Sequence, residues 1–335
     1  MARSRLSTAL TDGHLSIPES GDVALVRPPA GYDAGGLPAE RLTVVHGFRP
    51  DAAYWEAMGH DVATDMPRAA MTIIVVPRSK RLARALVAEA AAQGGVVVVD
   101  GQKTDGVDGL YREVRGRVGD LPSLTKAHGR LFSFDASAAD FSDWRGAGPV
   151  KGPHGFFTYP GVFSEDGIDA GSELLAGALP DKLGPRVADL GSGWGYLTRA
   201  VLDRAGVTHV DAIEAECLAV EAARLNVTDA RVQHHWSDVT RFEANEPFDT
   251  IVTNPPFHTS RKADAGLGLA FINAAARMLA PMGDLWLVAN RHLPYETGLN
   301  EAFRIVEERD GSSAFKIFRA ARPIRAETRT RVRRR

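Results

Sequence analysis

Apolar stretches alternate with segments of helical periodicity along most of the chain. In the first half, we expect buried strands at 42–47, 71–76, 96–99 and 129–134. Helices are predicted between them, at 51–59, 79–93 and 105–118. Continuous apolar strands separated by helices are typical of a parallel sheet that is covered on both faces. The polar residues 1 to about 20 lack such periodicity, and we expect a loose terminus there.

The second half repeats this alternation after a segment rich in Gly, Pro, Asp and Ser, from about 135 to 155. We place the domain boundary in this segment, between 145 and 146. Five further strands are expected at 187–190, 209–214, 231–236, 248–252 and 284–289. Two closing strands, at 303–306 and 315–318, have no long helix between them and predict an antiparallel pair at the sheet edge. The pattern therefore predicts two tandem Rossmann-like α/β domains, 1–145 and 146–322. We expect a seven-stranded mixed sheet with helices on both faces in the second.

The composition is that of a globular protein, because 44% of the 335 residues are hydrophobic and 24% are charged. The longest apolar runs are far too short to span a bilayer, and the N-terminus lacks the apolar core of a signal peptide. We therefore expect a cytoplasmic protein. The net charge of −2 conceals a basic end, since 319–335 contains eight arginines and one glutamate. We expect 323–335 to be a disordered tail that contacts phosphates.

A glycine-rich turn follows the first strand of the second domain. Its residues are Asp189, Leu190, Gly191, Ser192, Gly193, Trp194 and Gly195. Glycines at every second position let the backbone pass close to a ligand. The spacing differs from the dinucleotide fingerprint, whose third glycine comes one position later. The turn is a candidate cofactor site, although a tight turn without a ligand fits the same residues.

Acidic residues end the next two strands. Glu214 ends 209–214, and an acid at this position can accept hydrogen bonds from both hydroxyls of a ribose. Asp238 follows 231–236 and could accept from an adenine amino group or cap a helix. The carboxyl ends of parallel strands meet at one edge, which is where open α/β sheets bind ligands. The turn and the two acids together therefore predict a nucleoside site.

The fourth strand of this domain ends in the sequence Asn-Pro-Pro-Phe-His, residues 254–258. Two consecutive prolines make a stiff, non-helical corner that holds the amide and the aromatic ring at fixed places. An amide oxygen accepts a hydrogen bond from an exocyclic amine, and an aromatic ring stacks on a base. The same residues also fit a rigid turn whose Asn caps a helix and whose Phe packs in the core. The candidate catalytic residues are Asn254, Pro255, Pro256 and Phe257.

These motifs, in this order, make the second domain resemble the class I S-adenosylmethionine-dependent methyltransferases. Three further segments are similar to bacterial ribosomal RNA guanine-N2 methyltransferases of the small-subunit type: 160–164, 166–175 and 288–295. Residues 101–107 resemble a segment of the N-terminal, cofactor-free copy of the fold in that family. The resemblance therefore covers both halves of the chain and is strongest from Gly161 to Tyr295.

The resemblance implies an enzyme that uses S-adenosyl-L-methionine to methylate N2 of a guanine in 16S rRNA, within the assembled small ribosomal subunit. It also implies that the N-terminal domain is a degenerate copy that serves stability and RNA docking. No metal is implied, and we expect a monomer. The implied cofactor-binding residues are Asp189, Gly191, Ser192, Gly193, Gly195, Glu214, Asp238 and Asp169. Asp169 would hold the methionine end of the cofactor, or cap a helix.

Other reactions and roles stay open at this point. The large-subunit sister reaction on 23S rRNA and amino methylation of DNA adenine or of a protein glutamine use the same motifs. A NAD-dependent oxidoreductase and a non-catalytic ribosome-assembly factor are alternatives of other kinds. Carbon-5 methylation of a pyrimidine normally needs a cysteine nucleophile, and the only cysteine, Cys217, is expected to pack on a helix. His234 and His235 are expected to be structural strand residues, whereas His258 and His292 would support the site or contact RNA.

Overall fold

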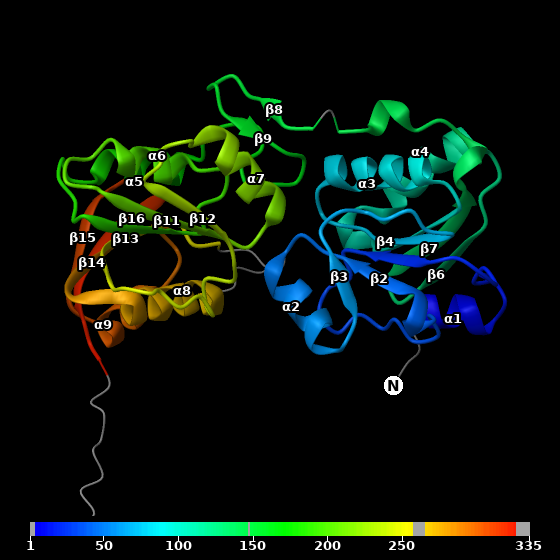
Figure 1. The fold of residues 1–335 in the computed structure, drawn as a ribbon, viewed down its shortest axis with the longest axis horizontal. Coiled ribbons are helices and arrows are strands. Elements are labelled where there is room, and N and C mark those ends of the chain that lie inside the picture. Colours follow the sequence, from blue (N-terminus) through cyan, green and yellow to red (C-terminus); the bar gives the residue numbers. More distant parts are fainter. Residues whose placement is uncertain (1–3, 147, 257–264, 326–335) are drawn as a thin grey trace, which may run out of the picture. The chain divides into compact units, whose positions relative to one another are not determined.

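The computed structural model describes residues 4–146, 148–256 and 265–325, and Figure 1 shows their arrangement. The chain divides into two compact units. The N-terminal unit comprises Met1–Lys151, Thr158–Glu165 and Glu216–Leu218. The C-terminal unit comprises Gly152–Phe157, Asp166–Ala215 and Ala219–Arg335. A short ribbon of two strands, β8 (Val150–Lys151) and β9 (Phe157–Thr158), lies where the chain passes from one unit to the other.

The N-terminal unit contains a seven-stranded sheet in the order β3-β2-β1-β4-β5-β7-β6. Its first five strands are parallel, and the pairs β5·β7 and β6·β7 are antiparallel. The strands are β1 (Val23–Val26), β2 (Leu42–Val45), β3 (Asp61–Ala63), β4 (Met71–Val75), β5 (Val96–Gln102), β6 (Ser123–Lys126) and β7 (Gly129–Asp135). The helices are α1 (Arg5–Thr11), α2 (Arg49–Ala57), α3 (Lys80–Gln93) and α4 (Val107–Val118).

The C-terminal unit contains a second seven-stranded sheet with the equivalent order, β12-β11-β10-β13-β14-β16-β15. Again the first five strands are parallel, and β16 pairs antiparallel with both β14 and β15. The strands are β10 (Arg186–Leu190), β11 (His209–Glu214), β12 (Val232–Trp236), β13 (Phe248–Thr253), β14 (Leu279–Asn290), β15 (Phe303–Gly311) and β16 (Phe315–Pro323). The helices are α5 (Ala170–Ala178), α6 (Tyr196–Leu202), α7 (Cys217–Asn226), α8 (Ala265–Met278) and α9 (Glu296–Ala302). In Figure 1, α5 and α6 cover one face of this sheet while α8 and α9 cover the other.

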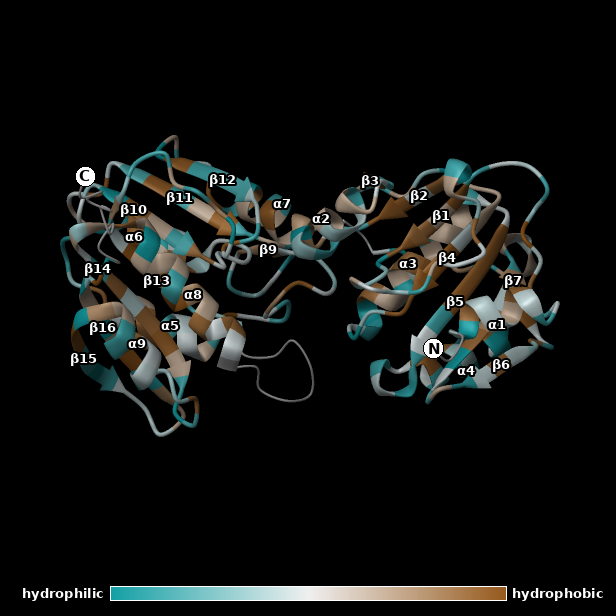
Figure 2. Ribbon diagram, turned by 90° about the horizontal axis from the view of Figure 1, so that it is seen from below, coloured by the Kyte–Doolittle hydropathy of each residue, from teal (hydrophilic) through white to brown (hydrophobic). Residues whose placement is uncertain are grey.

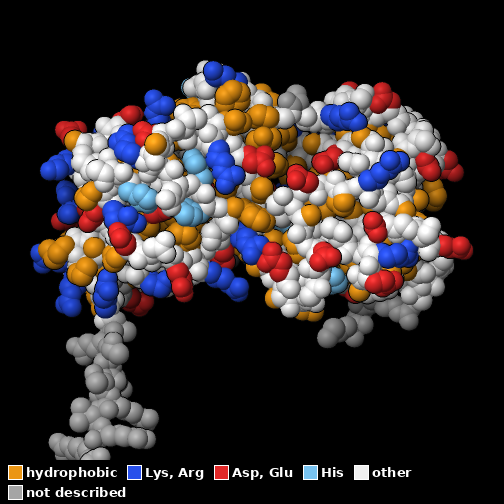
Figure 3. Space-filling view, viewed as in Figure 1, with side chains coloured by type: hydrophobic (Ala, Val, Ile, Leu, Met, Phe, Trp, Pro, Cys, Tyr) orange, Lys and Arg blue, Asp and Glu red, His pale blue; other side chains and the backbone are white. Residues whose placement is uncertain are grey.

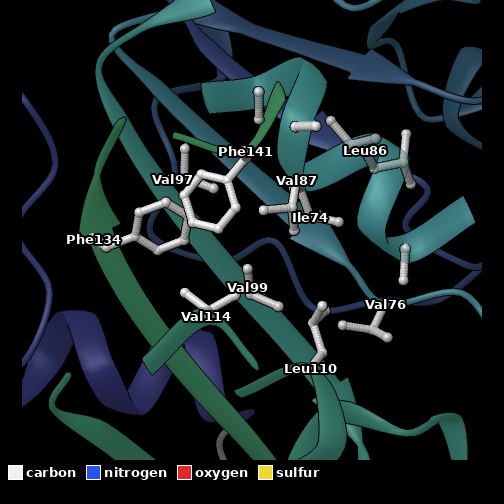
Figure 4. Close-up of a cluster of buried hydrophobic side chains, with 14 of the residues drawn as sticks. Ile74, Val76, Leu86, Val87, Val97, Val99, Leu110, Val114, Phe134 and Phe141 are labelled. Carbon is white, nitrogen blue, oxygen red and sulfur yellow. The ribbon is translucent and has the colours of Figure 1, made fainter. Parts of the chain in front are cut away.

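Each sheet is apolar on both faces because helices cover both, and Figure 2 shows the hydrophobic residues concentrated along the strands. Figure 4 shows one of the resulting cores, in which side chains of α3 and α4 pack on the strands β4, β5 and β7. Phe134 and Phe141 meet there with ring centroids 5.3 Å apart. The predicted α/β class, the tandem sheets and the antiparallel closing strands are confirmed.

The prediction of a loose N-terminus is wrong for residues from Arg5 onward. Helix α1 begins after Ser4, whose side chain accepts a hydrogen bond from the backbone N–H of Ser7. Leu6 and Ala9 are fully buried against the sheet. Arg5 is buried as well, and its Nε donates to Asp100 Oδ1 at 2.6 Å. A helix of two turns with a buried arginine gives too few apolar positions for a periodic signal in the sequence.

Candidate functional site

Four neighbouring parallel strands of the C-terminal unit end at the same edge of the sheet. In the register of the sheet, Leu190 of β10 lies beside Ile213 of β11 and Thr253 of β13. Glu214, the last residue of β11, lies beside Trp236 of β12. The residues that follow these strand ends are therefore brought to one edge, as the sequence predicts. They are the glycine turn, Glu214, Asp238 and Asn254.

The glycine turn is held by the neighbouring strand end. The backbone N–H groups of Gly191 and Ser192 both donate to the carbonyl of Ile213, at 2.9 and 3.1 Å. All three glycines have left-handed backbone angles, with φ of 73° at Gly191, 53° at Gly193 and 96° at Gly195. A Cβ added at Gly193 would meet nothing within 4 Å, so the backbone there faces open space. The turn therefore leaves room for a ligand to approach the main chain.

Asp189 is fully buried beneath this turn. One of its carboxylate oxygens, Oδ2, accepts from Thr198 Oγ1 of α6 at 2.7 Å. The other, Oδ1, has no hydrogen-bond partner among the residues that the structure describes. Burial raises the pKa of Asp189 to about 7, opposed by the hydrogen bond from Thr198 and increased by the charge of Glu214. A buried acceptor without a partner suits a cationic amino group of a ligand.

The two other predicted acids have different local roles. Glu214 Oε2 accepts a hydrogen bond from the N–H of Gly193 at 2.9 Å, so the acid fixes the middle of the glycine turn. Asp238 Oδ1 accepts from the N–H and the hydroxyl of Thr240, at 2.8 and 2.7 Å. A turn follows Asp238, so this carboxylate stabilises a turn and does not cap a helix. Both acids stand at strand ends on the same edge of the sheet, and Glu214 contacts the glycine turn.

Asn254 is held by two residues from the start of α5. Its Nδ2 donates to Asp169 Oδ2 at 2.8 Å and to Ser172 Oγ at 2.9 Å. The same oxygen of Asp169 accepts the N–H of Ser172 at 2.8 Å, so Asp169 caps helix α5. Pro255 is buried and Pro256 is exposed. The predicted catalytic residue Phe257 and the neighbouring His258 lie outside the described residues.

His234, His235 and Cys217 lie in regular secondary structure. Both His234 and His235 lie in β12, as expected, and Nε2 of His235 lies 2.6 Å from Asp211 Oδ1. Cys217 begins helix α7, which confirms its expected place on a helix. Trp194 is buried, with its ring centroid 4.9 Å from that of Phe156.

Sequence reasoning missed two residues that hold the proposed site together, Thr198 and Ser172. Thr198 lies on α6 and reaches Asp189 across nine positions of sequence. A polar residue on the buried face of the helix after a glycine turn is a signal that could have identified it. Ser172 is 82 positions from Asn254, and no local spacing relates the two. Within the described ranges, no group of three or more His, Cys, Asp or Glu side chains could hold a metal ion. None of the helices in these ranges is long and apolar enough to cross a bilayer.

Comparisons with known proteins relate the chain to methyltransferases. Residues 154–319 match the family model "Methyltransferase small domain". A ribosomal RNA small subunit methyltransferase C from Psychromonas ingrahamii is 35% identical over 159 residues, which cover 47% of this chain and 46% of that protein. The protein of the same name from Shewanella loihica is 28% identical over 258 residues, which cover 73% of this chain and 75% of that protein. The chain therefore spans about half the length of the first of these relatives and three quarters of the second.

Among solved structures, the chain is similar to a T. thermophilus 16S rRNA N2 methyltransferase in complex with AdoMet and guanosine. The TM-score is 0.76 and the identity 26%, over 92% of this chain and 90% of that one. The part of the chain that matches the methyltransferase family model contains nearly all of the second seven-stranded sheet, the glycine turn and the strand-end acids. The chain is therefore similar to methyltransferases over 154–319, and to a 16S rRNA N2 methyltransferase over most of its length.

Proposed function

We propose that this protein transfers a methyl group from S-adenosyl-L-methionine to N2 of a guanine in 16S rRNA. The observation that carries the proposal is the convergence of the glycine turn, Glu214, Asp238 and Asn254 at one edge of the C-terminal sheet. The similarity over most of the chain to a solved 16S rRNA N2 methyltransferase supports the choice of substrate. The assembled small subunit as the substrate particle, and a monomeric enzyme, are parts of the same proposal.

The described residues fit the cofactor. Asp189 Oδ1 is a buried acceptor without a described partner, which suits the cationic amino group of the methionine part. Glu214 and Asp238, at successive strand ends, would accept from the ribose hydroxyls and the adenine amine. Gly193 has open space at its Cα, so its backbone allows close approach. Gly191, Ser192 and Gly195 would shape the same turn. When bound, the cofactor supplies an electrophilic methyl group on a sulfonium.

Residues at the end of β13 would then hold the nucleophile. The N2 amine of guanine is a weak nucleophile because its lone pair is delocalised into the ring. The Asn254 side-chain oxygen and the Pro255 carbonyl would accept its two N–H groups and favour a pyramidal nitrogen whose lone pair points at the methyl group. Positioning of this kind is the main requirement of an in-line displacement. Phe257 would stack on the base, which must be unpaired or flipped out of a helix.

The N-terminal unit would serve stability and RNA docking. Figure 3 shows acidic and basic side chains interspersed on the visible face, without a large field of one sign. Several arginines of this unit form ion pairs, such as Arg117 with Asp143 and Arg130 with Asp108. Additional attraction to phosphates would come from the basic end of the chain, where 326–335 lies outside the described residues. The 23S reaction is the nearest alternative, because it needs the same amine-holding residues.

Asn254→Ala is expected to bind S-adenosylhomocysteine as the wild type does and to lose at least about 100-fold in kcat. The reason is that a preorganised acceptor at the reacting atom is worth a factor of about 10²–10³. Calorimetry measures the binding and methyl incorporation into small subunits measures the rate. The matched control is Asn300→Ala, an exposed asparagine whose Nδ2 donates to the Glu296 carbonyl. An unchanged rate for Asn254→Ala would remove this residue from the mechanism.

The substrate is identified by mass analysis of rRNA nucleosides from a strain that lacks the protein. Loss of one N2-methylguanosine from 16S rRNA, restored by the wild-type chain and not by Asn254→Ala, is the expected result. Loss from 23S rRNA would establish the sister reaction. Absence of S-adenosylhomocysteine binding to the wild type would overturn the methyltransferase proposal as a whole.

A further inference from the structure

The amide of Asn254 is oriented by its neighbours. A side-chain amide presents a donor NH₂ at one end and an acceptor oxygen at the other, and the two ends have nearly the same shape. In this protein the NH₂ end faces Asp169 Oδ2 at 2.8 Å and Ser172 Oγ at 2.9 Å. Both hydrogens of Nδ2 are therefore used. No described residue donates to Oδ1, which lies at the opposite end of the amide.

The carboxylate of Asp169 fixes the orientation of the Asn254 amide. An ionised carboxylate only accepts hydrogen bonds, so a flipped Asn254 would place its oxygen against an oxygen of Asp169. Hydrogen bonds to a charged group are stronger than those between neutral groups, which favours the observed orientation. Asp169 is itself held, because the same oxygen accepts the N–H of Ser172 at the start of α5. The helix start thus fixes Asp169, and Asp169 fixes Asn254.

We propose that Asp169 and Ser172 are positioning residues that turn the Asn254 oxygen toward the reacting group, so that the site selects a nucleophile carrying N–H donors. This inference rests on the proposed function of Asn254. An exocyclic amine satisfies the acceptor, whereas guanine N7 and O6 offer only lone pairs and would face it unfavourably. Asp169 therefore contributes to the choice of atom through Asn254, a different role from the cofactor contact expected from the sequence.

Substitutions at Asp169 separate this role from helix capping. Serine is as good an N-cap as aspartate, but its shorter side chain does not reach Asn254. Asp169→Ser should therefore keep α5 and release the amide. Asp169→Asn can place its own side-chain oxygen where Oδ2 lies and should rescue most of the activity. Ser172→Ala removes the second acceptor. The matched control is Glu173→Gln, which changes an exposed acid in the first turn of the same helix.

We expect Asp169→Ser to lower kcat about 10- to 100-fold, the rate equivalent of one hydrogen bond to a charged group. The affinity for S-adenosylhomocysteine should stay within about twofold of the wild type. In the Asn254→Ala background, Asp169→Ser should cost nothing further, because its effect passes through Asn254. Additive losses in this cycle, or a loss of cofactor affinity in Asp169→Ser alone, would overturn the proposal and make Asp169 a cofactor ligand.

A second measurement does not depend on the substrate. The side-chain NH₂ of Asn254, assigned by its disappearance in Asn254→Ala, should give a nitrogen–proton correlation signal shifted by its contact with a carboxylate. This signal should move in Asp169→Ser and return toward its wild-type position in Asp169→Asn. An unmoved signal would show that the hydrogen bond is absent, whatever the enzyme methylates. If the wild type fails to methylate guanine but the signal moves as expected, the proposed function fails while the orientation of Asn254 by Asp169 stands.

Discussion

The two seven-stranded sheets have the same strand order, and they differ most clearly where their strands end. In the C-terminal unit, β10 leads into three glycines with left-handed angles. The equivalent strand of the N-terminal unit, β1, leads into Arg27-Pro28-Pro29, and Arg27 adopts a φ of 55° that is costly for a residue with a side chain. The carbonyl of Pro28 accepts from Trp55 Nε1 at 2.9 Å, so this turn is held by its own unit.

The second strand end shows the same contrast. Glu214 of β11 fixes the glycine turn, whereas the N-terminal unit has His46 after β2. His46 is buried and its Nδ1 accepts from the N–H of Phe48 at 3.1 Å. Burial, together with the charge of Arg27, lowers the pKa of His46 to about 3, so the imidazole is neutral near pH 7. The alternation of strands and helices therefore specifies the fold, and we propose that the few residues after each strand decide whether a sheet can hold a nucleoside.

The largest effect on stability is expected in the N-terminal unit, at the carboxylate of Asp100. It accepts from Arg5 Nε at 2.6 Å and from the Tyr32 hydroxyl at 2.8 Å. Arg5 and Asp100 are buried, and Tyr32 is half-buried. Burial, and then the charge of Asp100, raises the pKa of Tyr32 well above its usual value. Asp100→Ala leaves the arginine buried without its partner and should destabilise the unit by about 3–5 kcal/mol.

Denaturant unfolding followed by circular dichroism measures this loss. Saturating S-adenosylhomocysteine should stabilise only the transition of the C-terminal unit, by mass action. The control is the double replacement Arg5→Met and Asp100→Leu, which removes both charges and should recover much of the stability. A ligand-dependent shift in the transition that Asp100→Ala weakens would mean that the N-terminal unit also binds the nucleoside.

The next largest effect should come from Asp189 and depend on pH. Its pKa is raised to about 7 in the folded protein by burial, from an unfolded value of about 3.9. Between these values the folded state holds a proton that the unfolded state releases, so stability should fall as pH rises from about 4 to about 7. Asp189→Asn keeps a polar side chain of the same shape and removes this dependence.

The variant should therefore become more stable than the wild type as pH rises, by up to about 4 kcal/mol above pH 7, while its cofactor affinity falls. Unfolding free energies at several pH values, for Asp189→Asn and wild type without ligand, measure the effect. Asp181→Asn, at an exposed carboxylate of the same unit, is the matched control. Parallel curves for wild type and Asp189→Asn would show that the buried carboxylate does not hold the extra proton.

All seven strands of the C-terminal sheet and four of the N-terminal sheet were predicted, because their apolar runs are bounded by turn residues. Strands β1, β3 and β6 were not predicted. Each is only 3 or 4 residues long, and β1 stands among polar residues and prolines. Helix α1 was missed because the burial of its Arg5 depends on Asp100, 95 positions along the chain. Local sequence patterns indicate a segment's own preference for helix or strand. These elements are stabilised instead by residues far along the chain, so their local patterns are weak.

In the candidate site, too, some residues were predictable from the sequence and others were not. Asp189, Glu214, Asp238 and Asn254 stand at strand ends, a position that sequence reveals once the strands are known. The contact between Asn254 and Asp169 joins residues 85 positions apart and was not predictable from spacing. It exists because α5 packs against the sheet with its N-terminus at the edge where β13 ends. The assignment of all these residues to cofactor and substrate stays a prediction.

The smallest expected effect separates backbone strain from ligand contact. Gly193 and Gly59 both have left-handed angles, with φ of 53° and 86°, and an added Cβ would meet nothing within 4 Å at either. Alanine at each position should therefore cost about 1–2 kcal/mol of strain and no clash. Only Gly193→Ala should also weaken S-adenosylhomocysteine binding, by at least about tenfold, because its new methyl group enters the space that a ligand would occupy. Calorimetry on the two variants measures the effect of the added methyl group on ligand binding, because the backbone strain is similar in both. Equal affinities would mean that the glycine turn is needed for its conformation alone, and the difference between the two sheets would then lie in their acids.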